Sequence, residues 1–137
     1  LESVNRLLLE RRADMYATLD AVFLDLRSGE AEFMKYGAPP SYLFRNAELH
    51  EVRSEALPAG IVDEAVPSIS TARLKRHDTV FLFTDGALDA LGPGLNDAIR
   101  ATMKNAKTSQ EAAQTLLEHA CQKEHTDDMT VMVIRIA

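Results

Sequence analysis

The sequence predicts an α+β fold built mainly from antiparallel strands. Three patterns indicate it: alternating apolar and polar residues around short turns in the first half, two runs that are apolar on both faces in the second half, and helical spacing between those runs. Strands joined by tight turns pair antiparallel, and a run of such strands followed by a pair of helices is typical of the α+β class.

The first residues predict the end of an amphipathic helix. Leu1, Val4 and Leu8 fall near helical spacing, and charged residues between positions 2 and 12 supply the polar face. The chain begins with Leu rather than Met and is already inside this pattern. We therefore expect it to be an N-terminally truncated piece of a longer protein.

Two hairpins are expected in the first half of the chain. Their predicted strands are residues 19–26, 30–36, 42–44 and 49–52. Ser28–Gly29 supplies the first turn and residues 45–47 supply the second. The paired prolines in residues 37–40 place a loop between the hairpins, because proline cannot donate to a strand ladder. Residues 54–77 are weakly patterned and leave room for one more strand.

The second half is predicted to form a strand, two helices and another strand. The predicted boundaries are residues 79–83 and 129–136 for the strands, and 95–106 and 108–121 for the helices. Gly92–Pro93–Gly94 breaks the chain before the first helix, and Thr108 with Glu111 forms a capping-box pair that opens the second. Both strands are apolar on both faces, which is typical of the centre of a covered sheet.

The composition excludes several classes of partner. The 15 Lys and Arg against 21 Asp and Glu give a formal charge of −6, which argues against nucleic acid or an anionic membrane surface. No apolar run approaches the roughly 20 residues of a membrane span. The single cysteine, Cys121, excludes an internal disulfide and fits a reducing cytoplasm. We expect one domain over residues 1–137, in the cytoplasm, with any membrane anchor outside this chain.

Two acidic motifs lie where the strands of the second half end and begin. Asp85–Gly86 follows the strand at 79–83, and Asp127–Asp128 precedes the strand at 129–136. Two helices joined by a short turn can return the chain to the same end of the sheet, so the motifs should meet. Close carboxylates repel each other unless a divalent cation lies between them. The sequence therefore predicts a site for Mg²⁺ or Mn²⁺, which prefer oxygen ligands.

Each motif alone has a plainer interpretation. Asp-Gly is a common turn dipeptide, and two aspartates before a strand can be a solvated cap. The shared location is what favours a metal site.

The motifs resemble those of a known enzyme family. Phe81–Ala90 together with Asp127–Val131 is similar to the C-terminal metal motifs of the metal-dependent PPM (type 2C) serine/threonine phosphatases. Four further segments resemble the stage II sporulation protein E family in particular: Ala17–Asp20, Gly29–Phe33, Gly37–Ser41 and Leu57–Ile61. The resemblance implies a β-sandwich flanked by helices, and dephosphorylation of phosphoserine on a small anti-sigma-factor antagonist protein during sporulation.

The resemblance also assigns roles to residues. Asp85 and Asp127 match aspartates that bind metal in the family, and Asp128 is expected to orient its neighbour. Gly86 and Asp89 belong to the same motifs, and we expect them to support the metal ligands. The implied mechanism uses two Mn²⁺ or Mg²⁺ ions that share a hydroxide, which attacks phosphorus in line, so no side-chain nucleophile is needed.

One part of the family pattern is missing from the 137 residues. Family members carry an earlier Asp-Gly motif whose aspartate bridges both metals, whereas Asp85–Gly86 is the only Asp-Gly here. We therefore expect the chain to be the C-terminal portion of the phosphatase domain, inactive alone and with half of the metal ligands. Uncovered sheet surface in such a piece would also favour self-association.

The sequence bears on three other interpretations. His119, Cys121 and His125 suggest a zinc site, but positions 119 and 121 point about 200° apart on a helix, and Cys121 is more simply a small core residue. A haloacid-dehalogenase-type phosphatase needs a nucleophilic aspartate where Phe83 stands. A non-catalytic binding or assembly module derived from a phosphatase stays open as the alternative function.

Overall fold

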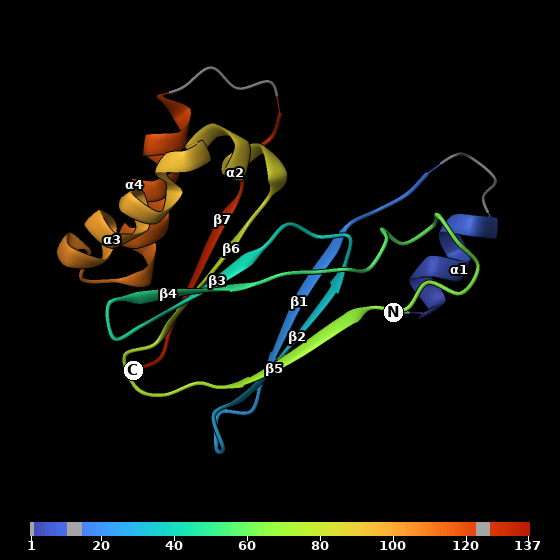
Figure 1. Ribbon diagram of the computed structural model, residues 1–137, viewed down its shortest axis with the longest axis horizontal. Coiled ribbons are helices and arrows are strands. Elements are labelled where there is room, and N and C mark those ends of the chain that lie inside the picture. The colour runs from blue at the N-terminus through green and yellow to red at the C-terminus, as the bar shows by residue number, and fades with distance from the viewer. Residues whose placement is uncertain (1, 11–14, 123–126) are drawn as a thin grey trace. The chain divides into compact units, whose positions relative to one another are not determined.

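Seven strands in the described part of the chain form two antiparallel sheets, one of three strands and one of four (Figure 1). The computed structural model describes residues 2–10, 15–122 and 127–137. Residues 1–38 and 53–74 belong to one compact unit, and residues 39–52 and 75–137 belong to the other. Each unit contains one of the sheets.

The three-stranded sheet of the first unit is built around the first predicted hairpin. Its strands are β1 (Leu19–Leu24), β2 (Glu30–Tyr36) and β5 (Ser68–Arg73), in the order β1-β2-β5. β5 is the additional strand for which the sequence left room. Side chains alternate between the two faces of the sheet. Ala31 and Phe33 are therefore buried on one face, while Phe23 and Ile69 on the other face are 57% and 53% exposed.

A buried ion pair joins β1 to β2. Asp20 and Lys35 are cross-strand partners, and the Lys35 Nζ atom lies 2.6 Å from Oδ2 of Asp20. The Lys35 side chain is only 1% exposed. Burial lowers the pKa of Lys35, and the hydrogen bond to Asp20 opposes that shift.

Helix α1 (Glu2–Glu10) confirms the expected N-terminal helix. The buried side-chain amide of Asn5 connects α1 to another segment of the first unit. The Nδ2 atom of Asn5 donates to the carbonyls of Val62 and Asp63, each at 3.1 Å. Its Oδ1 atom accepts from the N–H of Gly60 at 2.7 Å. Because all three partners lie in the segment before β5, Asn5 fixes α1 to that segment.

The four-stranded sheet of the second unit has the order β4-β3-β6-β7. Its strands are β3 (Ser41–Arg45), β4 (Glu48–Val52), β6 (Thr79–Phe83) and β7 (Val131–Arg135). The second predicted hairpin is present, but its turn has two residues rather than three. Asn46 and Ala47 both have positive φ angles, 51° and 63°, as a type I′ turn requires.

Three helices accompany this sheet: α2 (Asp85–Leu91), α3 (Leu95–Asn105) and α4 (Ser109–Cys121). A single 3₁₀ turn, Gly92–Gly94, separates α2 from α3. The last two helices confirm the predicted pair, and the Thr108 hydroxyl accepts from the N–H of Glu111 as the capping box requires. The sequence did not predict α2.

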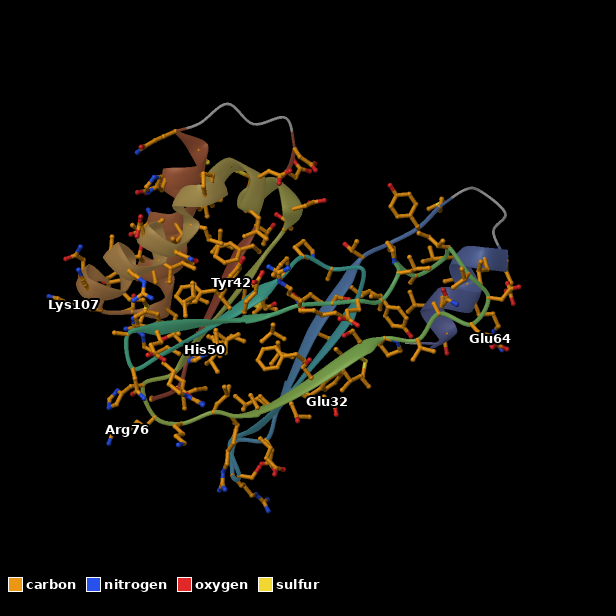
Figure 2. All side chains as sticks on the ribbon, in the orientation of Figure 1. Glu32, Tyr42, His50, Glu64, Arg76 and Lys107 are labelled. Carbon is orange, nitrogen blue, oxygen red and sulfur yellow. The ribbon has the colours of Figure 1, made fainter. Side chains whose placement is uncertain are left out.

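The helices and the sheet enclose the core of the second unit. Its largest buried members are Phe81, Phe83, Leu91, Leu95, Ile99 and Leu116. Tyr42, which is labelled in Figure 2, packs against this core. Its ring meets the ring of Phe83 edge to face, with the centroids 6.1 Å apart.

The expectation that Cys121 is a small core residue is wrong, because Cys121 is exposed. The buried stripe of α4 consists of Ala112, Leu116 and Ala120, and the residue after Ala120 is turned about 100° away from that stripe. Within residues 2–10, 15–122 and 127–137, every helix is too short or too polar to span a bilayer.

Candidate metal centre

The structure brings the two acidic motifs to the same end of two neighbouring strands. β6 and β7 pair antiparallel, and Phe83 with Val131 is the last pair of their register. Asp85 begins α2 two residues after Phe83, and Asp127 lies four residues before Val131, outside β7. The chain returns by way of α3 and α4, as the sequence argument required.

Thr84 holds the two motifs together directly. Its N–H donates to the carbonyl of Thr130 at 3.1 Å. Its hydroxyl accepts from the N–H of Thr130 at 2.9 Å and donates to the carbonyl of Asp128 at 3.3 Å. The segment that carries Asp127 and Asp128 is thus tied to the residue that precedes Asp85. Sequence reasoning missed this role of Thr84.

Gly86 allows the Asp127–Asp128 segment to come this close. A Cβ atom at Gly86 would lie 2.7 Å from the carbonyl oxygen of Asp128 and 3.2 Å from the Cβ of Asp127. The first distance is shorter than real Cβ contacts, and its partner is backbone, so any side chain here would force the segments apart. Gly86 therefore supports the site by leaving room for the Asp127–Asp128 segment. The sequence predicted a supporting role for Gly86 without saying what that role was.

Local hydrogen bonds orient both predicted ligands. One carboxylate oxygen of Asp85 accepts from the N–H of Gly86 at 3.0 Å, and one of Asp127 accepts from the N–H of Asp128 at 2.8 Å. Both side chains are exposed to solvent, as is Asp128. Asp89 is also exposed and lies one turn after Asp85 on α2.

These residues fit a hard divalent cation in part. Asp85 and Asp127 supply solvent-exposed carboxylate oxygens, the ligand type that Mg²⁺ and Mn²⁺ prefer, and water can fill the remaining positions. No group of three or more His, Cys, Asp or Glu side chains arranged to hold a metal occurs among the described residues. The donor set therefore suits one ion better than two, and the metal-binding roles of Asp85 and Asp127 stay predictions.

The competing sites gain no support. His119 is exposed near the end of α4, and His125 lies outside the described residues. Phe83, at the position where a dehalogenase-type phosphatase needs its nucleophile, is 5% exposed and belongs to the apolar core.

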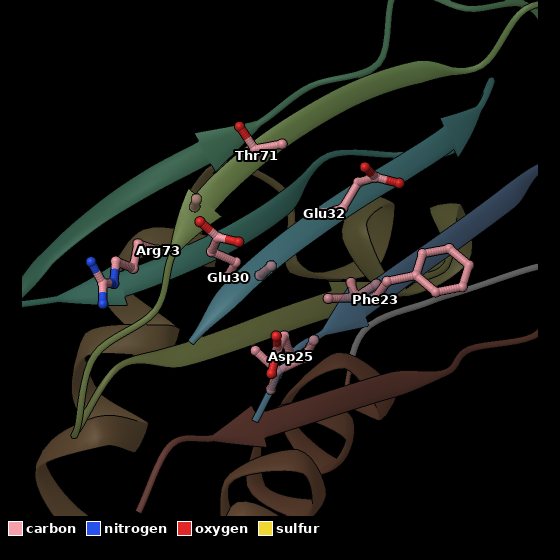
Figure 3. Close-up of a pocket in the computed structure, with 10 residues that line it drawn as sticks. Phe23, Asp25, Glu30, Glu32, Thr71 and Arg73 are labelled. Atoms are coloured by element: carbon pink, nitrogen blue, oxygen red, sulfur yellow. The ribbon is translucent and has the colours of Figure 1, made fainter. Parts of the chain in front are cut away.

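An open groove of about 930 Å³ lies over β1, β2 and β5 in the first unit (Figure 3). Asp25, Glu30, Glu32 and Arg73 supply its charged lining, and Phe23 supplies its largest apolar side chain. None of the predicted site residues lines this groove.

Comparison with known proteins gives a consistent picture. The family described as stage II sporulation protein E (SpoIIE) matches residues 1–137. Stage II sporulation protein E of Bacillus subtilis is 31% identical over 144 residues, which cover 99% of this chain and 17% of the relative. The chain thus spans about a sixth of that protein.

Solved structures agree with the sequence matches. The phosphatase domain of the cell fate determinant SpoIIE from Bacillus subtilis, presoaked with Mn, superposes with a TM-score of 0.72 at 31% identity, covering 98% of this chain and 63% of that one. A serine/threonine phosphatase from S. agalactiae gives a TM-score of 0.84 at 18% identity, over 99% of this chain and 67% of that one. At this identity, the second match bears on fold alone. The expected α+β class and the likeness to PPM phosphatases are confirmed.

Proposed function

The chain belongs to the stage II sporulation protein E family of PPM serine/threonine phosphatases, and we propose that it is the C-terminal portion of one phosphatase domain, with Asp85 and Asp127 as metal ligands. Both compact units would belong to that single domain. The observation that carries the proposal is the contact between the two acidic motifs, made by Thr84 and permitted by Gly86.

The roles of the residues follow from their positions. Asp85 and Asp127 would hold the cation, and the N–H of Asp128 would keep the Asp127 carboxylate oriented through its 2.8 Å hydrogen bond. Mn²⁺ or Mg²⁺, two ions in the complete domain, would activate water for in-line attack and neutralise the phosphoryl oxygens. The exposure of both carboxylates leaves room for a phosphorylated protein to approach.

The substrate we propose is phosphoserine on a small anti-sigma-factor antagonist protein in the cytoplasm, which would place the reaction in sigma-factor control during sporulation. The family match and the segments shared with the sporulation phosphatases support this assignment. The net charge of −6 favours a protein partner over nucleic acid.

A titration with Mn²⁺ tests the metal site. Asp127→Asn should weaken Mn²⁺ binding by about tenfold or more, because one of two carboxylate ligands is lost. Asp97→Asn is the matched control, since Asp97 is an exposed acid in the first turn of α3, as Asp85 is in the first turn of α2. Equal affinities for the two variants would reject the site.

A non-catalytic binding or assembly module is the second candidate. An Asp-Gly motif upstream of these residues in a longer parent would favour the enzyme, and its absence there would favour the module; the described residues themselves hold no three-acid metal cluster. Release of phosphate from a phosphoserine protein with Mn²⁺ separates the two functions. The assay should compare this chain with a longer parent polypeptide: activity of the longer one alone supports the enzyme, and inactivity of both supports the module.

A further inference from the structure

Thr84 occupies the N-cap position of α2, but its side chain does not cap that helix. Its φ and ψ angles are −75° and 161°, as an N-cap residue requires, and its hydroxyl makes no capping hydrogen bond. Thr108 at the same position of α4 behaves in the ordinary way and accepts from Glu111 at 3.0 Å. The two threonines thus have the same backbone role and different side-chain partners.

The hydroxyl of Thr84 instead crosses to the other acidic motif. It accepts from Thr130 and donates to the carbonyl of Asp128, so both of its hydrogen-bonding functions are used on one segment. Thr84 is adjacent to Asp85 in sequence, and Asp128 is adjacent to Asp127. The hydroxyl therefore connects the immediate neighbours of the two predicted metal ligands.

We propose that Thr84 is a positioning residue that sets the separation of the Asp85 and Asp127 carboxylates before a cation binds. This inference rests on the proposed function, in which those two residues hold the metal. Two carboxylates that share a cation would repel each other when it is absent. The hydrogen bonds of the Thr84 hydroxyl hold the two segments together, so a cation would meet ligands that are already in place.

Loss of the hydroxyl should therefore reduce metal affinity more than it reduces stability. Thr84→Val removes both side-chain hydrogen bonds and keeps the branched shape, whereas Thr84→Ser keeps the hydroxyl. Residues that orient metal ligands typically contribute about 10- to 100-fold to affinity. Thr108→Val is the matched control, because it removes a capping hydroxyl from the same unit at a helix that carries no predicted ligand.

The experiment measures Mn²⁺ affinity by calorimetry and amide hydrogen exchange at Thr130 by NMR, for the 137-residue chain and its variants. We expect Thr84→Val to raise the Kd by about tenfold or more, with Thr84→Ser close to the unsubstituted chain. Thr108→Val should lower the melting temperature and leave the Kd unchanged. The Thr130 amide should exchange faster in Thr84→Val only. Thr84→Ala repeats the test without the second methyl group if Val disturbs the fold.

Two results would overturn the inference. One is a Kd for Thr84→Val equal to that of the unsubstituted chain, and the other is an equal loss of affinity in Thr108→Val. If the unsubstituted chain binds no Mn²⁺, the proposed function fails by itself. Exchange at Thr130 then still decides the role of Thr84, since unchanged exchange in Thr84→Val would mean that the hydroxyl does not hold the segments together.

Discussion

The Arg45 guanidinium on β3 donates to both carboxylate oxygens of Asp78, with 2.5 Å between Nη2 and Oδ2. Asp78 is 3% exposed and also accepts from the N–H of Lys75 at 2.7 Å. Burial acts to raise the pKa of this carboxyl, but the hydrogen bonds from Arg45 and Lys75 outweigh it and lower the pKa. The pair therefore fixes the start of β6, the strand that leads to Asp85.

Asp78→Asn should destabilise the protein in a pH-dependent way. Removing the charge eliminates the ion pair between Asp78 and Arg45, and we expect a loss of roughly 2–3 kcal/mol in the free energy of unfolding at pH 7. The value lies below that of a fully buried pair because the Arg45 side chain is 26% exposed. Since the folded pKa of Asp78 is lowered, its stabilisation is present above the unfolded pKa of about 3.9 and disappears as pH falls through the folded value.

Urea unfolding at pH 7 and at pH 3 or below measures this difference. The stabilities of Asp78→Asn and the unsubstituted protein should converge in acid. A gap that stays constant over this range would mean that the carboxylate charge contributes nothing.

Gly86→Ala should destabilise the protein although alanine favours helices. Alanine in α2 would gain about 1 kcal/mol from helix propensity. The added Cβ would lie 2.7 Å from the backbone oxygen of Asp128, and such overpacking costs roughly 1–3 kcal/mol. We expect the steric term to dominate, with a lower melting temperature and weaker Mn²⁺ binding. Gly94→Ala is the control, because nothing lies within 4 Å of a Cβ there.

Asp85→Asn should leave the metal-free fold intact or slightly more stable. The Thr84 contacts join the segments that carry the two predicted ligands, and the substitution removes the charge of one of them, so repulsion between the two carboxylates would be relieved. Thermal melting in the presence of a chelator gives the result. A fall of several degrees would identify Asp85 as a structural residue instead of a metal ligand.

The 137-residue chain should self-associate, bind Mn²⁺ weakly and show no useful phosphatase turnover. Phe23 and Ile69 expose apolar surface on one face of the first sheet, and β1 and β5 are its edge strands. Phe23→Lys should reduce association, because it replaces an exposed apolar side chain with a charged one. The fold should tolerate the lysine, since position 23 stands opposite Glu32 on β2. Sedimentation velocity measures both proteins. A monomeric unsubstituted chain that releases phosphate from a phosphoserine protein would contradict this prediction.

Local patterns were sufficient to predict most elements, but not α2. The hairpins follow from alternation and turn residues, and α4 follows from its apolar spacing and capping box. α2 has only seven residues and begins with Asp-Gly, a typical turn pair. Burial of Ala87, Ala90 and Leu91 stabilises it, and this tertiary packing is not visible in a short segment.

In the candidate site, too, one feature could be predicted from the sequence and another could not. The proximity of Asp85 and Asp127 followed from topology, because two helices return the chain to its starting edge. The role of Thr84 did not follow, since a threonine before a helix is expected to cap it. Only the structure shows that Thr130 and Asp128 are its partners instead.

The two compact units are interleaved along the chain, so neither can be obtained by a single cut. The backbone passes from one unit to the other three times, after residues 38, 52 and 74, because the β3–β4 hairpin is inserted into the sequence of the first unit. A cut after residue 38 separates β5 from the rest of the first unit, a cut after residue 74 separates the β3–β4 hairpin from the rest of the second, and a cut after residue 52 does both. A polypeptide that keeps both sheets intact must therefore include all three junctions.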